Sequence, residues 1–376
     1  MVHPWALPGG KRAVCVFVLV LAAYTLQTES IQYVQRVSGY DKPLTLLYVT
    51  HSSFILLLPA YLFVLRVSGR DAKGAVDALR RDIAIHMDHL SSKWGLSHAP
   101  LSVAGRAKLF TLVIVILTFG LTLPSLSWFL AVPFTSMGNI TAIYNTFSIW
   151  ALVLAIAVLG EPWKLRDAGA VLLACAGVTL VAYGGASQSY APASRALLGD
   201  GLALLGAVSM AVYETIYRIV ATVEDKTQGY ALIQGERQPE EEASEENIPV
   251  TGEESYAPLP FGMYAISMTT GIGVATMTLF WAPLLAAHIL GWETLELPPS
   301  TGAVGVIALS IVCGVLFNGA FTVLLSLWGP VLASVSCLLT TVLVQAADVA
   351  LGMPWTWMSV AGCAIVACGF SLLVWF

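Results

Sequence analysis

Charged residues are scarce in this sequence, and their scarcity argues against a soluble globular protein. Asp, Glu, Lys and Arg make up 11% of the 376 residues, whereas about a quarter is usual in soluble domains. Hydrophobic residues make up 57%, and the mean hydropathy is +0.78. We therefore expect an integral membrane protein with many spans, which lies in the lipid bilayer and has lipid as a partner.

Cysteine pairs and catalytic motifs are also missing. All six cysteines lie inside apolar runs, so the sequence offers neither a disulfide framework nor a zinc spacing. It contains no nucleophile and base triad, P-loop or helix-borne HExxH pattern. His86, Asp88 and His89 invite a metal interpretation, but two histidines on one exposed turn are more often solvated. We expect no enzymatic activity, no cofactor, no metal and no nucleic acid partner.

The net charge of -5 comes from one segment. Residues 224–254 hold ten acidic and two basic residues, so the rest of the chain is net positive by three charges. The surrounding loop, 219–260, has too few apolar residues to build a core, and we interpret it as a disordered tether. A partner-binding segment is the alternative interpretation of this loop.

Ten apolar runs approach the ~20 residues that a helix needs to cross a bilayer. Lys11 and Arg12 precede the first run, which leaves a cleaved signal peptide as an alternative to a first span. The predicted spans are 13–33, 44–65, 108–131, 137–159, 166–184, 197–219, 261–285, 303–325, 328–350 and 356–376.

The distribution of Lys and Arg predicts the orientation. With the N-terminus in the cytoplasm, fifteen of them lie inside and only Arg36, Lys42 and Arg195 lie outside. Both termini and the loops 66–107 and 219–260 are then cytoplasmic. The first of these loops contains apolar residues spaced by three and four, which predicts an amphipathic helix at the membrane interface. These residues are Ala72, Val76, Leu79, Ile83, Met87 and Leu90.

Residues 136–185 form a membrane hairpin that recurs near the C-terminus. An offset of 192 residues places Gly160, Pro162, Trp163 and Gly177 on Gly352, Pro354, Trp355 and Gly369. This internal duplication predicts two repeats, 1–196 and 197–376, with five spans each. An odd number of spans gives the repeats opposite orientations. The predicted fold is an all-α integral membrane protein of ten transmembrane helices in two inverted five-helix repeats.

Polar residues inside spans are costly, so they are the first candidates for substrate binding and coupling. A carboxylate among them could instead lie at the membrane–water interface without a role in transport. Helix-to-helix hydrogen bonding explains a buried asparagine equally well. The candidates are Glu29, Tyr144, Asn145, Asn318, Gln345 and Asp348.

Glu214 and Arg218 lie four residues apart in the sixth span, in the order that favours an ion pair. We expect this pair to be structural, with a role in coupling as the alternative. Apart from Arg218, no Lys or Arg lies inside a predicted span away from its ends. A phosphate-bearing substrate would find no bidentate partner there, so a small neutral or cationic molecule is favoured.

The repeated hairpin resembles the drug/metabolite transporter superfamily, EamA type. The resemblance lies in residues 139–145, in the Gly160 and Glu161 turn, and in the spacing of Gly169 and Gly177. It implies ten spans in two inverted halves and transport of small metabolites by alternating access. The implied central cavity is lined by spans one, three, four, six, eight and nine.

The first two spans narrow the resemblance to solute carrier family 35, subfamily F, including thiamine-transporter-like proteins. Met353 replaces the glutamate of the turn in the second copy, and the paired lysines typical of nucleotide-sugar transporters are not visible. Both departures argue against nucleotide-sugar exchange. The residues that carry this second resemblance are Glu29, Lys42, Pro43, Tyr48, Thr50, Ser52, Ser53, Phe54, Leu58, Pro59, the run 199–204 and Tyr213.

The sequence therefore predicts a secondary active transporter of a small organic metabolite. The alternative is a membrane scaffold or receptor that does not transport and binds a partner through the acidic loop. We expect an endomembrane, the vacuole or the Golgi, rather than the plasma membrane, and leave a homodimer open.

Overall fold

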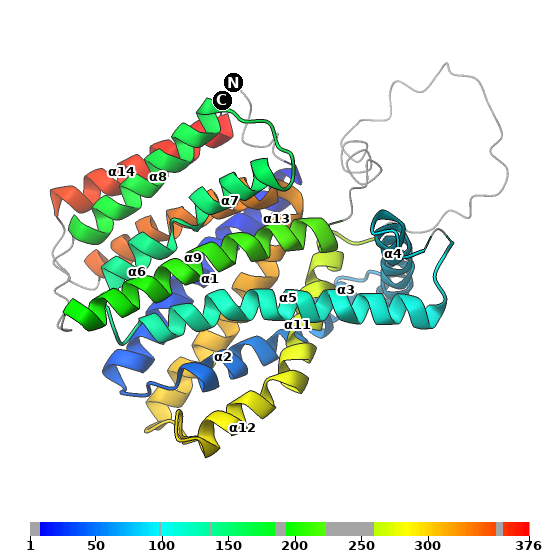
Figure 1. Cartoon of the computed structure of the whole chain (residues 1–376), viewed down its shortest axis with the longest axis horizontal. Coiled ribbons are helices and arrows are strands. Elements are labelled where there is room, and N and C mark those ends of the chain that lie inside the picture. The colour runs from blue at the N-terminus through cyan, green and yellow to red at the C-terminus, as the bar shows by residue number, and fades with distance from the viewer. Residues whose placement is uncertain are drawn as a thin grey trace.

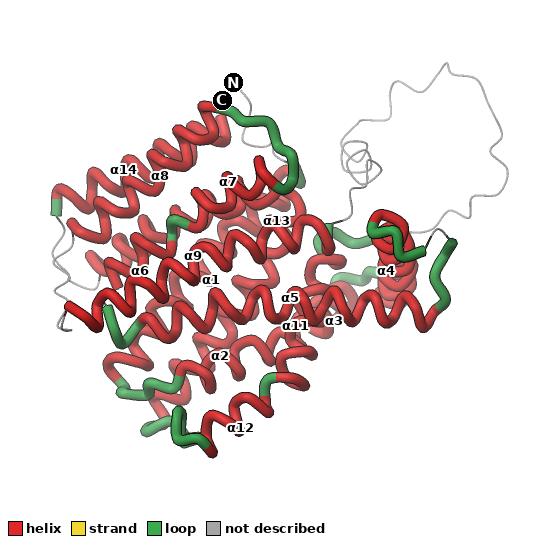
Figure 2. Tube along the Cα trace, in the orientation of Figure 1, coloured by secondary structure: helices red, strands yellow, loops and turns green. Residues whose placement is uncertain are grey.

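The structure is a computed structural model, and it describes residues 8–97, 99–135, 137–184, 193–222, 259–350 and 356–375. Within this described part every regular element is a helix and no strand is present (Figure 2). The all-α membrane class predicted from hydropathy is confirmed at this level. Residues 219–222 and 259–260 are all that is described of the acidic loop, so its predicted disorder lies outside the described residues.

The first half of the chain contains helices up to α8, and the second begins with α9. The predicted boundary at 196 and 197 falls in the first turns of α9. The helices are α1 (Gly10–Gln32), η2 (Tyr33–Val37), α2 (Pro43–Ser52), η3 (Ser53–Leu56), α3 (Leu57–Val67), α4 (Ala72–Lys93), α5 (Val103–Ala131), α6 (Met137–Tyr144), α7 (Phe147–Ala157), α8 (Leu165–Gly184), α9 (Ala193–Ala221), α11 (Met263–Leu279), α12 (Trp281–Ile289), α13 (Thr301–Ala350) and α14 (Trp357–Trp375).

In the described part, nine helical segments are long and apolar enough to cross a membrane. The eighth, Thr301–Ala347, covers the region in which the sequence predicts two spans. It belongs to α13, which runs for 50 residues and breaks at Gly329, where φ is 74°. This backbone conformation suits glycine, and the following Pro330 has no N–H for the helix ladder. The break therefore falls at the predicted boundary between spans eight and nine.

Several spans are interrupted by local chemistry. Residues 43–67 change from α2 through the short 3₁₀ turn η3 to α3. Pro59 cannot donate to the carbonyl of Ile55, which explains the irregular turn before it. The fourth span breaks between α6 and α7, next to Asn145 and Thr146. Interruptions of this kind free backbone groups, and in a bilayer such groups must be satisfied by neighbouring helices.

Three long helix pairs dominate the interior. Helix α1 packs along α13, α5 packs along α9, and α8 packs along α14 (Figure 1). The first pair joins elements from opposite ends of the chain, and each of the three pairs joins one helix from each half. Figure 1 shows α8 and α14 side by side at the edge of the bundle, and α4 at its far end.

The α8 and α14 pair is built on glycine. A Cβ added at Gly177 would lie 2.7 Å from the backbone nitrogen of Val366, and one at Gly362 would lie 2.7 Å from the carbonyl oxygen of Gly177. A Cβ at Gly369 would lie 2.8 Å from the carbonyl oxygen of Ala170. The two backbones therefore touch, as small residues allow in membrane helices. Gly177 and Gly369, matched by the sequence duplication, lie in the same interface.

The loop between α3 and α5 contains helix α4, where the sequence predicts an amphipathic helix. Leu79, Met87 and Leu90 of the predicted apolar stripe are buried. Asp88 ties α4 to α5 through Arg106, whose Nη2 donates to the carboxylate at 2.6 Å. This hydrogen bond, together with the backbone N–H of Leu101, holds the pKa of Asp88 below its usual value.

A second tie lies at the opposite end of the bundle, before helix α2. Glu293, in the loop after α12, accepts hydrogen bonds from the backbone nitrogens of Leu44 and Thr45, each at 2.8 Å. The carboxylate thus caps the N-terminus of α2, where backbone donors have no helical partner. Tyr40 adds a hydrogen bond of 2.8 Å to the carbonyl of Glu296. The loop after α1 is therefore fastened to the second half of the chain.

Candidate functional site

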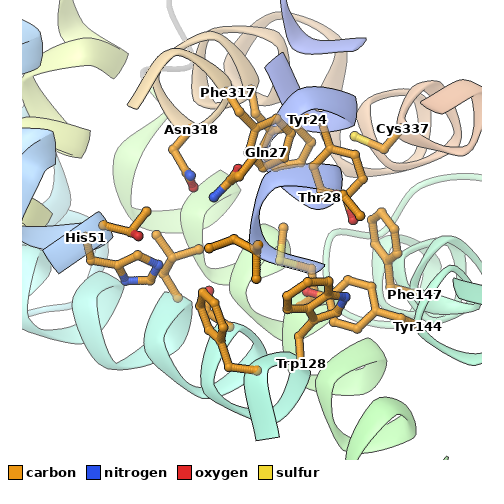
Figure 3. Close-up of a pocket in the computed structure, with 17 residues that line it drawn as sticks. Tyr24, Gln27, Thr28, His51, Trp128, Tyr144, Phe147, Phe317, Asn318 and Cys337 are labelled. Atoms are coloured by element: carbon orange, nitrogen blue, oxygen red, sulfur yellow. The ribbon is translucent and has the colours of Figure 1, made fainter. Parts of the chain in front are cut away.

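One cavity lies among the long helices, about 800 Å³ in volume including space that is continuous with the exterior. Residues from α1, α2, α5, α6, α7, α9 and α13 line it, so both halves of the chain contribute (Figure 3). Its mostly apolar lining, with a few amide and hydroxyl groups, is of the kind found in small-molecule sites. The lining residues are Tyr24, Gln27, Thr28, Ile31, Thr50, His51, Leu121, Ser125, Trp128, Phe129, Tyr144, Phe147, Met210, Phe317, Asn318, Phe321 and Cys337.

Aromatic rings form a large part of the wall. The ring centroids of Tyr24 and Phe317 are 4.7 Å apart, and those of Phe317 and Phe321 are 5.6 Å apart. Figure 3 shows Trp128 and Tyr144 together on one side of the cavity, with Tyr24 and Phe317 across from them. An aromatic face attracts a cation, and several faces around one space form the usual cage for an organic ammonium group.

Polar groups enter the cavity at a few points. Gln27 and Thr28 come from α1, and Asn318 comes from α13 (Figure 3). Asn318 donates from Nδ2 to the carbonyl oxygen of Gly314 at 2.9 Å, which leaves its amide oxygen as an acceptor. A Cβ at Gly314 would lie 2.8 Å from Gln27 Nε2, so the glycine makes room for this amide. The polar groups can orient a ligand that the aromatic walls hold.

His51 adds one titratable side chain to the cavity lining. It is 4% exposed, its ring stacks on Phe54 with centroids 5.0 Å apart, and its Nδ1 has no hydrogen-bond partner among the described residues. Neither lysine nor arginine appears among the described lining residues. The site therefore offers aromatic faces, amides and hydroxyls rather than fixed positive charge.

Of the candidates predicted from sequence, Tyr144 and Asn318 line the cavity. Asn145 lies behind it, where its Nδ2 approaches Thr341 Oγ1 at 3.5 Å and its carbonyl accepts from Cys175 Sγ at 3.7 Å. This geometry fits the alternative of helix-to-helix hydrogen bonding.

The other coupling candidates are not among the described lining residues. Glu29 follows Gln27 and Thr28 on α1, is partly buried, and is not among the lining residues. Gln345 is partly buried eight residues beyond Cys337 and is likewise not among them. The side chain of Asp348 lies outside the described residues. The roles given to these residues remain predictions.

The predicted ion pair between Glu214 and Arg218 is wrong in this structure. Arg218 donates from Nη1 to the carbonyl oxygen of Ser326 at 2.9 Å. Both carboxylate oxygens of Glu214 are buried and have no hydrogen-bond partner among the described residues. Spacing allowed the pair, but the carbonyl of Ser326, near the break in α13, lies within reach of the long arginine side chain and accepts its hydrogen bond instead.

The cluster of His86, Asp88 and His89 does not converge on one point. His86 Nε2 lies 3.0 Å from the carbonyl oxygen of Val220 and therefore carries a proton, whereas Asp88 binds Arg106. Burial lowers the pKa of His86. In the described residues no group of three potential ligands could hold a metal ion.

Sequence reasoning missed most of the cavity wall. Tyr24, Trp128 and Phe317 lie inside apolar runs, where aromatic residues are ordinary, and nothing in the pattern brings them together. His51 carried a usable signal, because an ionisable residue inside a span is rare and marks a functional candidate.

Comparison with known proteins gives two findings and one negative result. No protein-family model matches the chain. It is 24% identical over 275 residues to the Thiamine-repressible mitochondrial transport protein THI74 of Saccharomyces cerevisiae, a match that spans 69% of this chain and 63% of the yeast protein. One protein known from a crystal structure matches with a TM-score of 0.52 and 14% identity, over 96% of each chain. This second match supports the fold alone.

Two general statements follow, one on the membrane class and one on the compartment. The apolar helices make the chain an integral, multi-pass membrane protein. The yeast relative is named as a transport protein and as mitochondrial, and it gives no support to the vacuole or the Golgi.

Proposed function

We propose that this chain is a secondary active transporter that moves a small neutral or cationic organic metabolite across a membrane by alternating access. The observation that carries the proposal is the cavity, which is lined by aromatic rings and amides from both halves of the chain and, among its described lining, by no lysine or arginine. A site between two halves is where rocking of one half against the other changes access.

The proposed architecture has ten spans in two inverted five-helix repeats, 1–196 and 197–376. Trp328, beside the break in α13, donates from Nε1 to the carbonyl of Pro8 at 3.1 Å. The break in α13 therefore lies near the start of α1, which favours a turn between two spans at the membrane face where α1 begins. Phe17 near the start of α1 stacks on Phe370 near the end of α14, with centroids 5.5 Å apart. Both ends on one face require an even number of crossings, which supports counting α13 as two spans.

The helix pairs also support exchange between the repeats. Helix α1 of the first repeat packs on α13 of the second, and α9 of the second packs on α5, α6 and α7 of the first. The final helices of the two repeats, α8 and α14, pack on each other. This reciprocal pattern is what two repeats related by a two-fold axis in the membrane plane would produce. The resemblance to the EamA type and to solute carrier family 35, subfamily F, belongs to the same proposal.

Uptake into proteoliposomes tests the function. Labelled substrates should include thiamine, because the yeast relative is thiamine-repressible and thiamine is an aromatic organic cation. A neutral organic metabolite and an anionic nucleotide complete the panel. We expect saturable uptake of a cationic or neutral compound and none of the nucleotide. Deleting residues 230–256 should leave this uptake intact, whereas a scaffold that binds through its acidic loop would show no uptake and would lose its partner.

Labelling tests the proposed orientation. Ser91 is buried, so Ser92, its exposed neighbour on α4, is the better position for a single cysteine. Ser92→Cys should react with an impermeant reagent from the cytosol only. A cysteine at Ser244, outside the described residues, should behave in the same way. Labelling of either position from the opposite face alone would contradict the inverted arrangement.

A further inference from the structure

Glu214 is a buried carboxyl group without a partner. Its side chain on α9 is fully buried, and neither carboxylate oxygen has a hydrogen-bond partner among the described residues. An unpaired charge in a membrane interior is far more costly than a hydrogen-bonded or neutralised one. Arg218, one turn away, binds the carbonyl of Ser326 instead. The carboxyl therefore needs a proton or a cation to be stable where it lies.

Glu214 is also close to the cavity. Met210, four residues earlier on α9, lines the cavity, and residues four apart share a helix face. Tyr144 and Cys337, two further lining residues, are within electrostatic range of the Glu214 carboxyl. The group thus lies one turn along α9 from the cavity wall, toward the end of the helix that holds Arg218.

Among the described residues that pack around Glu214, no fixed positive charge lies at this depth. Helix α9 packs on α5, α6, α7 and α13. The charged residues of α5, Arg106 and Lys108, lie in its first two turns, and Arg106 is bound to Asp88. Helix α7 carries no titratable side chain. Helix α6 contributes Tyr144, and α13 contributes Cys337 with Cys313 further along.

The hydroxyl group of Tyr213, next to Glu214 on α9, is also buried and has no hydrogen-bond partner among the described residues. Two neighbouring unsatisfied polar groups are uncommon in a folded interior, where buried polar groups are nearly always bonded. Their grouping beside the cavity points to a place that binds something during the working cycle.

We propose that Glu214 is a proton site that couples the proposed transport to exchange of a proton for an organic cation. While enclosed, the carboxyl holds a proton. When the cavity wall opens to water, the O–H bond breaks, the proton passes to water on that side, and the carboxylate becomes the counter-charge for a cation held by the aromatic rings. One carboxyl neutralises one unit of charge, so proton and cation binding exclude each other. This inference rests on the proposed function only for its coupling step.

Glu214→Gln is the sharpest variant, because the amide keeps the shape of the protonated acid and cannot release a proton. We expect the variant to fold with a Tm within about 2 °C of the wild type, since no ion pair is lost. Accumulation of the transported cation driven by a pH gradient should fall at least tenfold. Glu161→Gln, which changes an exposed glutamate in the turn before α8, should leave accumulation unchanged. Gradient dependence equal to wild type in Glu214→Gln would overturn the coupling role.

A readout without substrate separates this inference from the proposed function. In infrared difference spectra the C=O stretch of a protonated carboxyl should disappear as the pH is raised, and Glu214→Gln should lack this band. If the wild type transports nothing in the panel but shows the band, the proton site stands and the proposed function fails. Absence of the band in the wild type would overturn the proton site. Should Glu214→Gln not fold, Glu214→Asp should keep gradient-driven uptake with a shifted pH profile, and loss of that dependence would contradict the proposal.

Discussion

The α8 and α14 pair and the central cavity differ in the size of the residues that form them. In the pair, Gly177, Gly362 and Gly369 bring two backbones into contact, so little room is left there for side chains to rearrange. In the cavity, large aromatic side chains and amides surround open space, and each can adopt another rotamer. Close backbone contact favours rigidity, whereas a space lined by side chains favours binding and release. We infer that the pair is a fixed support and the cavity the working region.

The largest expected effect breaks the support. In Gly177→Ala the new Cβ would meet the backbone of Val366 at 2.7 Å, and backbone atoms cannot swing aside as side chains can. We expect a loss of ~1–3 kcal/mol, seen as a fall in Tm of roughly 3–8 °C in detergent. Gly169→Ala is the matched control. Gly169 lies on the same helix as Gly177, but a Cβ added there would meet no atom within 4 Å. Equal Tm values for the two variants would contradict the rigid interface.

A smaller effect, on function rather than stability, is expected in the cavity. Tyr24→Leu keeps an apolar side chain but removes the aromatic face that lies 4.7 Å from Phe317. A cation–π contact is worth about 0.5–2 kcal/mol, so KM for a cationic substrate should rise about 2- to 30-fold. Uptake of a neutral analogue should change little.

The control for this variant is Tyr33→Leu, at an exposed tyrosine beyond the end of α1. Equal changes in KM for the cation and the neutral analogue would show that Tyr24 acts through shape alone. The pair of substrates therefore separates cation recognition from simple lining of the cavity.

The smallest effect is expected at the surface, outside both regions. Asp88→Asn removes the ion pair with Arg106, and partly exposed pairs contribute little, so Tm should fall by no more than about 2 °C at neutral pH. The folded-state pKa of Asp88 is lowered, first by the hydrogen bond from Arg106. Its stabilisation is therefore present above the unfolded pKa near 4 and is lost as the pH falls through the lower folded pKa.

Thermal unfolding measured between pH 7 and pH 3 checks this sign. The difference between wild type and Asp88→Asn should persist down to about pH 4 and shrink below it. A difference that grows on acidification would show that another group controls this end of the bundle.

Hydropathy and spacing by themselves determined a helical, multi-span membrane chain, because lipid forces every spanning segment to satisfy its own backbone as a helix. They also located the glycines that recur at 177 and 369 and the helix that became α4. These features depend on composition and periodicity, which are local. The duplication predicted a transporter architecture, and transport itself is the function proposed above.

Only the tertiary structure decided which residues meet. Tyr24 and Phe317 lie 4.7 Å apart although they are far apart in the chain, and no local pattern encodes that contact. Glu214 and Arg218 show the same limit at short range: their spacing permits an ion pair, but the long arginine side chain reaches a carbonyl on a neighbouring helix. The carboxyl of Glu214, which the spacing assigned to an ion pair, is left buried and without a hydrogen-bond partner among the described residues, because a second helix, α13, supplies a competing acceptor for Arg218.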